Sequence, residues 1–278
     1  MKRHVESVLK WGWLVMALPV WGAEDAETIV KKLIEAQRLN DKRAQQYTYV
    51  EETERFVVDK DGRARKTGSA THDVIFVEGF KFNKLLARNG KPLNAHDQAQ
   101  VEKNMRLTAE ERRKHQRPIA AGGVITFSSL FSHQSADLGS LSELLTLFDN
   151  RLAGEEEVRG HKAWVIESRP RAGYAPMSEH ERQVLVFRKR FWVDEAENVL
   201  VRAVYTVAPE DAFLRPGSSL TFESEKIDQD TWEPVSLTLE FSRAKEKEFR
   251  PEGRTVYRMS NFRRFDVQST ITVMEPEK

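Results

Sequence analysis

The first part of the chain shows two hydrophobic periods in succession. Between residues 26 and 43, apolar side chains recur at helical spacing and charged ones fill the other positions, which predicts an amphipathic helix. From residue 47 onward β-branched and aromatic residues predominate, as is typical of strands. Turn sequences follow at Asp61-Gly62, Glu78-Gly79 and Asn89-Gly90. We therefore expect a helix and then a meander of three strands, at 47–58, 65–77 and 80–88.

Two helical patterns and a long series of strands make up the rest of the chain. Residues 94–116 and 140–148 show helical patterns, and the segment 119–131 between them is strongly apolar. Strands are expected at 151–158, 161–168, 184–193, 199–207, 220–227, 235–244 and 256–273. Turns are expected at 159–160, 195–198, 229–230 and 251–253, and long, mobile loops at 169–183 and 208–219. Such regular spacing predicts an α+β protein with one large, curved antiparallel sheet or an open barrel.

The strand expected at 184–193 is apolar on both faces. Leu185, Phe187 and Phe191 share one parity, whereas Val186 and Trp192 share the other. A half-exposed antiparallel sheet normally packs one face on a core and turns the other to water. Two interpretations therefore remain open: a sheet flanked by helices without a cavity, or a half-barrel with an apolar pocket.

The N-terminus has the layout of a secretory signal peptide. A basic start at Lys2 and Arg3 precedes an uncharged run, residues 11–23, that is shorter than the roughly 20 residues of a membrane-spanning helix. We expect removal of residues 1–23, a single domain over 24–278 and a periplasmic location. An uncleaved membrane anchor and a buried core helix are the alternatives.

Composition excludes several classes of protein. With 31% charged and 40% hydrophobic residues, the 278-residue chain is neither disordered nor a multi-span membrane protein. It contains no Cys, which excludes disulfides, Cys-ligated zinc and a cysteine nucleophile. A net charge of +1 gives no overall attraction to nucleic acid, and we expect none as a partner.

The sequence contains none of the common catalytic or cofactor-binding motifs. It lacks HExxH, Walker, G-x-G-x-x-G and G-x-S-x-G patterns, and its His residues do not have the spacing of metal ligands. We therefore assign no catalytic residue, no metal and no cofactor, and expect a protein that is not an enzyme.

The stretch 188–205 carries the most specific pattern in the chain. Trp192-Val193-Asp194 ends one strand and Val201-Arg202 lies in the next, with Asn198 in the turn where a Gly is usual. Trp232-Glu233-Pro234-Val235 and residues 260–266 add to this pattern. Together they resemble the periplasmic lipoprotein-carrier superfamily, which includes LolA-like and LolB-like proteins and the N-terminal domain of RseB-type envelope-stress regulators.

The resemblance implies an incomplete, half β-barrel whose open side is capped by helices. In carriers of this group the cavity holds acyl chains, which is binding without catalysis. The resemblance therefore favours a carrier for an apolar or lipidated ligand, such as a lipoprotein, with transient contacts to envelope membrane proteins. The alternative is an RseB-like module that uses the same sheet to bind a protein or to sense envelope stress.

The apolar segment 119–131 is the candidate lid of such a pocket. It contains Gly122-Gly123, which would weaken a helix or a strand but would permit a hinge. The predicted pocket and lid residues are Ile119, Val124, Ile125, Phe127, Leu130, Phe131 and Trp192, with Gly122 and Gly123 as the hinge. An apolar loop packed permanently on the sheet is the alternative.

Overall fold

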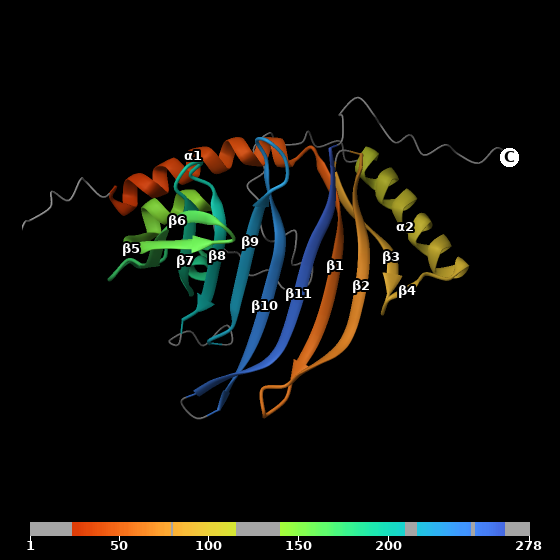
Figure 1. Cartoon of the computed structure of the whole chain (residues 1–278). Coiled ribbons are helices and arrows are strands. Elements are labelled where there is room, and N and C mark those ends of the chain that lie inside the picture. The colour runs from red at the N-terminus through yellow and green to blue at the C-terminus, as the bar shows by residue number, and fades with distance from the viewer. Residues whose placement is uncertain (1–23, 79, 115–139, 209–215, 246–247, 265–278) are drawn as a thin grey trace, which may run out of the picture.

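The protein is an α+β fold built on one 11-stranded antiparallel sheet, as a computed structural model shows (Figure 1). The structure describes residues 24–78, 80–114, 140–208, 216–245 and 248–264. The strand order is β4-β3-β2-β1-β11-β10-β9-β8-β7-β6-β5, with β4 and β5 at the two edges, so the sheet is not closed into a barrel. This confirms the predicted class and the single large sheet.

The elements have the following bounds. The helices are α1 (Ala26–Ala44), α2 (Ala95–Lys114), α3 (Leu144–Leu147) and α4 (Glu179–Val184), with a 3-10 turn at Leu141–Glu143. The strands are β1 (Tyr47–Val58), β2 (Ala64–Val77), β3 (Phe80–Arg88), β4 (Lys91–Pro92), β5 (Phe148–Val158), β6 (His161–Pro170), β7 (Phe187–Asp194), β8 (Leu200–Val207), β9 (Ser219–Lys226), β10 (Trp232–Lys245) and β11 (Glu248–Arg264).

Pairing of the first strand with the last joins the two halves of the sheet. β1 pairs with β11 from Tyr47↔Arg264 to Val57↔Gly253, so that the meander β1–β4 continues the series β5–β11. Every neighbouring pair of strands is antiparallel. The meander predicted from the first hundred residues is therefore correct, but the strand that it joins is the most distant one in sequence.

The main core lies between α1 and one face of the sheet. Ile29, Val30 and Leu33 of α1 are fully buried and belong to one cluster with Phe191 and Leu237. Asp25 begins the helix by accepting a hydrogen bond from the Thr28 N–H at 2.9 Å. Figure 1 shows α1 lying across one end of the strands, whereas α2 lies beside β2 and β3 near the opposite edge. We call the face that packs on α1 the helix-side face.

A second, smaller core cluster confirms that β7 is apolar on both faces. Phe191 and Val193 point into the main core, whereas Trp192 belongs to the second cluster with Val165 and Trp232. Alternating side chains of one strand point to opposite faces, so Trp192 lies on the other side of β7 from Phe191. Its indole N–H donates a hydrogen bond to Glu156 at 2.7 Å.

Three details differ from the sequence prediction. Residues 179–184 form α4 rather than loop and strand, because Ser178 caps the helix by accepting from the Glu181 N–H at 3.1 Å. The expected turn at 251–253 lies inside β11, where a bulge in the pairing with β10, between Phe241 and Ser242, accommodates Pro251. The short strand β4 was not predicted.

Some predictions concern residues outside the described part of the chain. These are the signal peptide at 1–23, the apolar segment with Ile119, Val124, Ile125, Phe127, Leu130 and Phe131, the hinge at Gly122 and Gly123, and the end of the last strand. Among the described helices, none combines the length and apolar character needed to cross a membrane.

Candidate functional site

The helix-side face carries an apolar stripe whose burial decreases along the strands. On β10, Leu237 is fully buried, Leu239 is half-buried and Phe241 is 36% exposed. On β11, Met259 is buried and Tyr257 is half-buried. Apolar side chains thus continue from the core along β10 and β11. Figure 1 shows these strands bending and extending away from α1.

The opposite face is covered by ion pairs between neighbouring strands. The pairs are Arg190–Glu156 at 2.7 Å, and Arg202–Glu223, Arg254–Glu240 and Arg258–Glu54 at 2.6 Å each. These side chains are partly exposed, so each pair adds little to stability, about 0–1 kcal/mol. Their effect is to make this part of the opposite face polar and charge-balanced, in contrast to the apolar stripe of the helix-side face.

Two buried carboxylates lie near Tyr49 of the main core. Glu51 of β1 is 4% exposed, accepts a hydrogen bond from Thr53 Oγ1 at 3.4 Å and lies 3.7 Å from His72 Nδ1. Glu233 of β10 is 3% exposed, and its Oε1 has no hydrogen-bond partner in the described part of the chain. Burying a carboxylate without full pairing is costly.

Lys81 of β3 is the cation that acts on both carboxylates. Its ammonium lies 4.8 Å from the centroid of the buried Tyr49 ring. Burial raises the pKa of Glu233 to about 7, a change that Lys81 opposes and Asp41 reinforces. Burial also raises the pKa of Glu51, against the influence of Lys81. We call Glu51, Lys81 and Glu233 the buried-acid cluster.

The neighbouring groups extend this pattern of weakened ionisation. Burial lowers the pKa of the Lys81 ammonium, whereas Glu233 and Glu51 act to raise it. At the end of α1, burial raises the pKa of Asp41 to about 6. The region therefore disfavours isolated charge of either sign and holds more carboxylates than ammonium groups.

The start of β10 is held by α1 rather than by β11. Pairing of β10 with β11 begins at Ser236↔Arg258, so the preceding residues of β10 have no β11 neighbour. There the Asn40 amide replaces a strand: it accepts from the Trp232 N–H at 2.7 Å and donates to the Trp232 carbonyl at 2.8 Å. Glu233 follows directly, at the point where the two strands separate.

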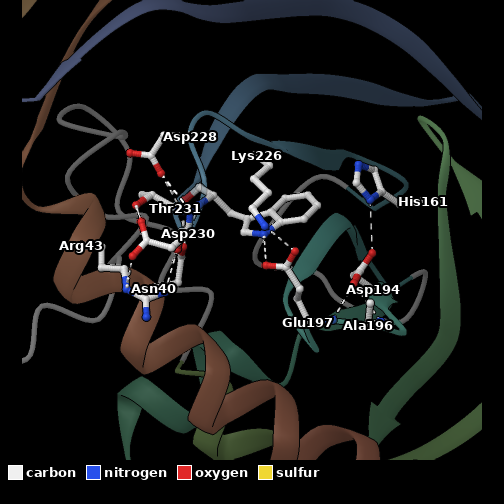
Figure 2. Close-up of polar contacts among 11 residues, drawn as sticks. Asn40, Arg43, His161, Asp194, Ala196, Glu197, Lys226, Asp228, Asp230 and Thr231 are labelled. Carbon is white, nitrogen blue, oxygen red and sulfur yellow. Dashed lines mark hydrogen bonds and ion pairs between the residues drawn. The ribbon is translucent and has the colours of Figure 1, made fainter.

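The turn between β7 and β8 is fixed by Asp194. Its Oδ1 accepts the N–H groups of Ala196 and Glu197 at 2.9 and 2.7 Å, and its Oδ2 lies 3.3 Å from His161 Nδ1 (Figure 2). A His–Asp pair is used in acid–base catalysis. Here the aspartate holds a turn and the His161 ring packs edge-on against Trp232 at 4.8 Å, so we assign the pair a structural role.

Trp232 joins this turn to the start of β10. Its indole N–H donates to Glu197 Oε2 at 3.0 Å, and Lys226 donates to the other oxygen of the same carboxylate at 2.6 Å (Figure 2). We call Asp194, Glu197 and Trp232, with their partners, the turn cluster. Through the bond between Trp232 and Glu197, the sequence patterns at 188–205 and 232–235 contact each other in the fold.

The turn between β9 and β10 is fixed in the same way. Asp228 Oδ1 accepts the N–H groups of Asp230 and Thr231 at 3.1 and 3.0 Å, and its other oxygen accepts from the Tyr47 hydroxyl. Arg43 donates to the Asp230 carbonyl at 2.7 Å, which attaches α1 to this turn (Figure 2). Within the described ranges, no group of three or more His, Asp or Glu side chains could hold a metal ion.

One of the predicted pocket residues lies in the described part of the chain. Trp192 is 6% exposed in the second core cluster, between the guanidinium groups of Arg190 and Arg202 at 4.9 and 5.4 Å from its ring. The other predicted pocket and lid residues lie outside the described part of the chain. A role for Trp192 in ligand binding remains a prediction.

Sequence reasoning missed the buried-acid cluster. One signal was present: Glu51 has the same parity in its strand as Tyr49 and Thr53, which are both buried. An acidic residue at an inward position is unusual. Nothing local indicated that Glu233, from the far end of the chain, would come near it.

Comparisons with known proteins return structures alone. No family model and no curated protein matches the chain. A structure of a DUF1329 family protein from Desulfovibrio piger matches with 16% identity and a TM-score of 0.37, over 89% of this chain and 96% of that one. A LolA superfamily protein from Nitrosomonas europaea matches with 12% identity and a TM-score of 0.34, over 88% and 96%.

Two further kinds of structure match over similar lengths. A putative outer membrane lipoprotein-sorting protein domain from Vibrio parahaemolyticus has 10% identity and a TM-score of 0.35, over 88% of this chain and 95% of that one. Structures of MucB, alone and with MucA, have TM-scores of 0.26 or 0.27. At these values the matches carry no information on ligand or partner. Over most of its length, the chain thus matches structures of the LolA superfamily, lipoprotein-sorting domains, DUF1329 and MucB.

Proposed function

We propose that the protein is an exported, non-catalytic carrier or binding protein for an apolar or lipidated ligand. The observation that carries the proposal is the apolar stripe on the helix-side face, where Leu237, Leu239 and Phe241 pass from full burial to exposure. An apolar ligand that covers such a stripe gains about 25 cal/mol for each Å² removed from water. The ion pairs of the opposite face offer no comparable gain.

The undescribed apolar segment has a role in this proposal. Ile119, Val124, Ile125, Phe127, Leu130 and Phe131 form a cover over the ligand, and Gly122-Gly123 allows the cover to open. Trp192, the remaining residue of our predicted binding set, lies on the opposite face, so any role that it has in binding does not involve the stripe. The proposed location is the periplasm, reached through a signal peptide at 1–23; N-terminal sequencing of the mature protein should begin near residue 24, whereas an intact Met1 would contradict this location.

Binding of a fluorescent fatty-acid probe tests the proposal, and β10 supplies a matched pair of variants. Leu239→Asp places a charge on the apolar stripe, whereas Thr238→Asp places the same charge one residue away, on the opposite face. We expect Leu239→Asp to weaken binding at least tenfold and Thr238→Asp to leave it unchanged. Phe127→Asp should also abolish binding while the far-ultraviolet circular dichroism stays intact.

The same measurement separates the carrier from its alternative. If the wild-type protein does not bind the probe, or if the two β10 variants bind equally well, the carrier proposal is wrong. Native mass spectrometry of the protein from its own periplasm is a separate test: a co-purifying lipid supports the carrier, and a co-purifying protein supports an envelope interaction module.

A further inference from the structure

The buried-acid cluster is the one place on the helix-side region where the described chain leaves a fully buried charged group incompletely paired. Five side-chain atoms in the described residues are buried without a hydrogen-bond partner: His72 Nδ1, Arg190 Nε, Glu195 Oε1, Asn198 Oδ1 and Glu233 Oε1. The first four belong to half-buried residues. Glu233 is 3% exposed, so its oxygen has no easy access to solvent.

Two other carboxylates near this point, Glu197 and Asp194, are well paired. Glu197 receives both the Trp232 indole N–H and the Lys226 ammonium, and Asp194 receives two backbone N–H groups. A buried oxygen left unpaired in a native protein calls for an explanation, such as a bound group that completes the site. The orphan oxygen of Glu233 therefore points to a hydrogen-bond donor that the described residues do not supply.

The charged groups around the cluster indicate that this donor carries a positive charge. The groups that act on Glu233 are Lys81 and Asp41, and those that act on Glu51 are Lys81 and Thr53. His72, which faces Glu51 from β2, has a lowered pKa caused by burial and by Arg55 and Arg88, so it does not add a positive charge at neutral pH. One ammonium thus stands among two fully buried carboxylates and a third at the end of α1.

The buried-acid cluster lies near strand residues that border the apolar stripe. Glu51 pairs across the strands with Met259, and Thr53 pairs with Tyr257, which belongs to the stripe. Glu233 lies where β10 separates from β11, beside the residues that Asn40 holds. Glu233 precedes Leu237 on β10, so only a ligand that extends past the buried end of the stripe would place one of its ends near the two carboxylates.

We propose that the carboxylates of Glu51 and Glu233 bind a primary ammonium group at the end of an amphiphilic ligand, in addition to the ammonium of Lys81. This inference rests on the proposed carrier function and names the head group that the apolar stripe alone leaves unspecified. An ammonium donates three hydrogen bonds, and charge-assisted bonds to carboxylates are about twice as strong as neutral ones. It would complete the coordination of Glu233 Oε1 and balance the excess of negative charge.

The ionisation of Glu233 makes the affinity for an ammonium ligand depend on pH. Because burial raises the pKa of this carboxyl to about 7, it is ionised at pH 8 and protonated at pH 5.5. An alkylammonium stays charged across this range, so only the protein side changes. Affinity for the ammonium should fall as the pH is lowered, while affinity for an uncharged chain of equal length stays constant.

The test compares dodecylammonium with dodecanol, each below its critical micelle concentration, by displacement of an uncharged fluorescent probe. At pH 8 the wild-type protein should bind dodecylammonium at least tenfold more tightly than dodecanol, and at pH 5.5 the preference should largely disappear. Glu233→Gln should abolish the preference at pH 8, with dodecanol binding retained. Glu240→Gln removes a carboxylate of the opposite face on the same strand and should leave the preference unchanged.

Each outcome has a distinct meaning. Equal binding of the two ligands by the wild-type protein, or a preference that survives in Glu233→Gln, overturns the ammonium site but leaves the carrier function standing. If neither ligand binds, the carrier function is contradicted, and the ammonium site with it. Thermal unfolding of Glu233→Gln at or above the wild-type temperature shows that a lost preference does not reflect a misfolded protein.

Discussion

Trp232 and Glu233 are consecutive residues, yet they belong to two clusters of opposite character. Trp232 is part of the turn cluster, where its indole, its N–H and its carbonyl all have partners. Glu233 is part of the buried-acid cluster, where a carboxylate oxygen has none among the described residues. Fully paired polar networks make a structure rigid, whereas incompletely paired ones cost stability. The comparison indicates that the first cluster maintains the fold and that the second is available to bind.

Disrupting the turn cluster should have the largest effect on the free energy of unfolding. Trp232→Ala removes a side chain that is 3% exposed, its contact with His161 and its bond to Glu197. It should lower the free energy of unfolding by about 3–5 kcal/mol, as large core truncations do. Urea unfolding measures this, and a loss below about 1 kcal/mol would show that the cluster contributes little to the fold.

Neutralising Glu233 should raise the free energy of unfolding, whereas loss of Trp232 lowers it. Its folded pKa of about 7 lies above the ordinary value of 4.5, so the wild-type protein loses stability as the pH rises from about 4.5 to 7. Glu233→Gln removes this penalty and should raise the free energy of unfolding at pH 8 by on the order of 3 kcal/mol, with little change at pH 4. Unfolding by urea at the two pH values tests the prediction.

Glu197→Gln is the matched control for that experiment. Burial acts to raise the pKa of Glu197, but the bonds from Lys226 and Trp232 prevail and the pKa is lowered. Its contribution is therefore present above pH 4.5 and is lost as the pH falls, so the substitution should destabilise the protein at pH 8. If both variants shifted stability in the same direction, the contrast between the clusters would be wrong.

Asn40 connects the two clusters, and its removal should have an intermediate effect. Asn40→Ala leaves the Trp232 N–H and carbonyl buried without partners and should cost about 2 kcal/mol. Arg38→Ala, on the exposed side of the same helix, should change the free energy of unfolding by less than about 0.5 kcal/mol. Equal effects of the two substitutions would contradict the role given to Asn40.

The smallest effect concerns the turn itself. Asn198 has a φ of 57°, a conformation that glycine adopts without strain, and its Oδ1 is buried without a hydrogen-bond partner among the described residues. Asn198→Gly should therefore stabilise the protein by less than about 1 kcal/mol, because the greater freedom of glycine in the unfolded chain offsets part of the gain. A measured destabilisation would mean that the Asn side chain makes a contribution that the geometry of the turn does not reveal.

Much of the local structure followed from the sequence. The helical spacing of apolar residues between 26 and 43 predicted α1, and the strand expected at 235–244 corresponds to β10. Asn198 was recognised as the substitute for a turn glycine, and its positive φ confirms this. These features depend on backbone preference and on the period of burial, which neighbouring residues determine.

Tertiary structure alone decided the position of the candidate site. Glu51 and Glu233 lie near opposite ends of the chain, and they approach each other because β1 pairs with β11 while Asn40 holds the start of β10 apart from it. Their raised pKa values have the same origin, since burial is a property of the assembled sheet. Local sequence determines whether a segment forms a strand, but long-range pairing and burial determine which side chains meet and how they ionise.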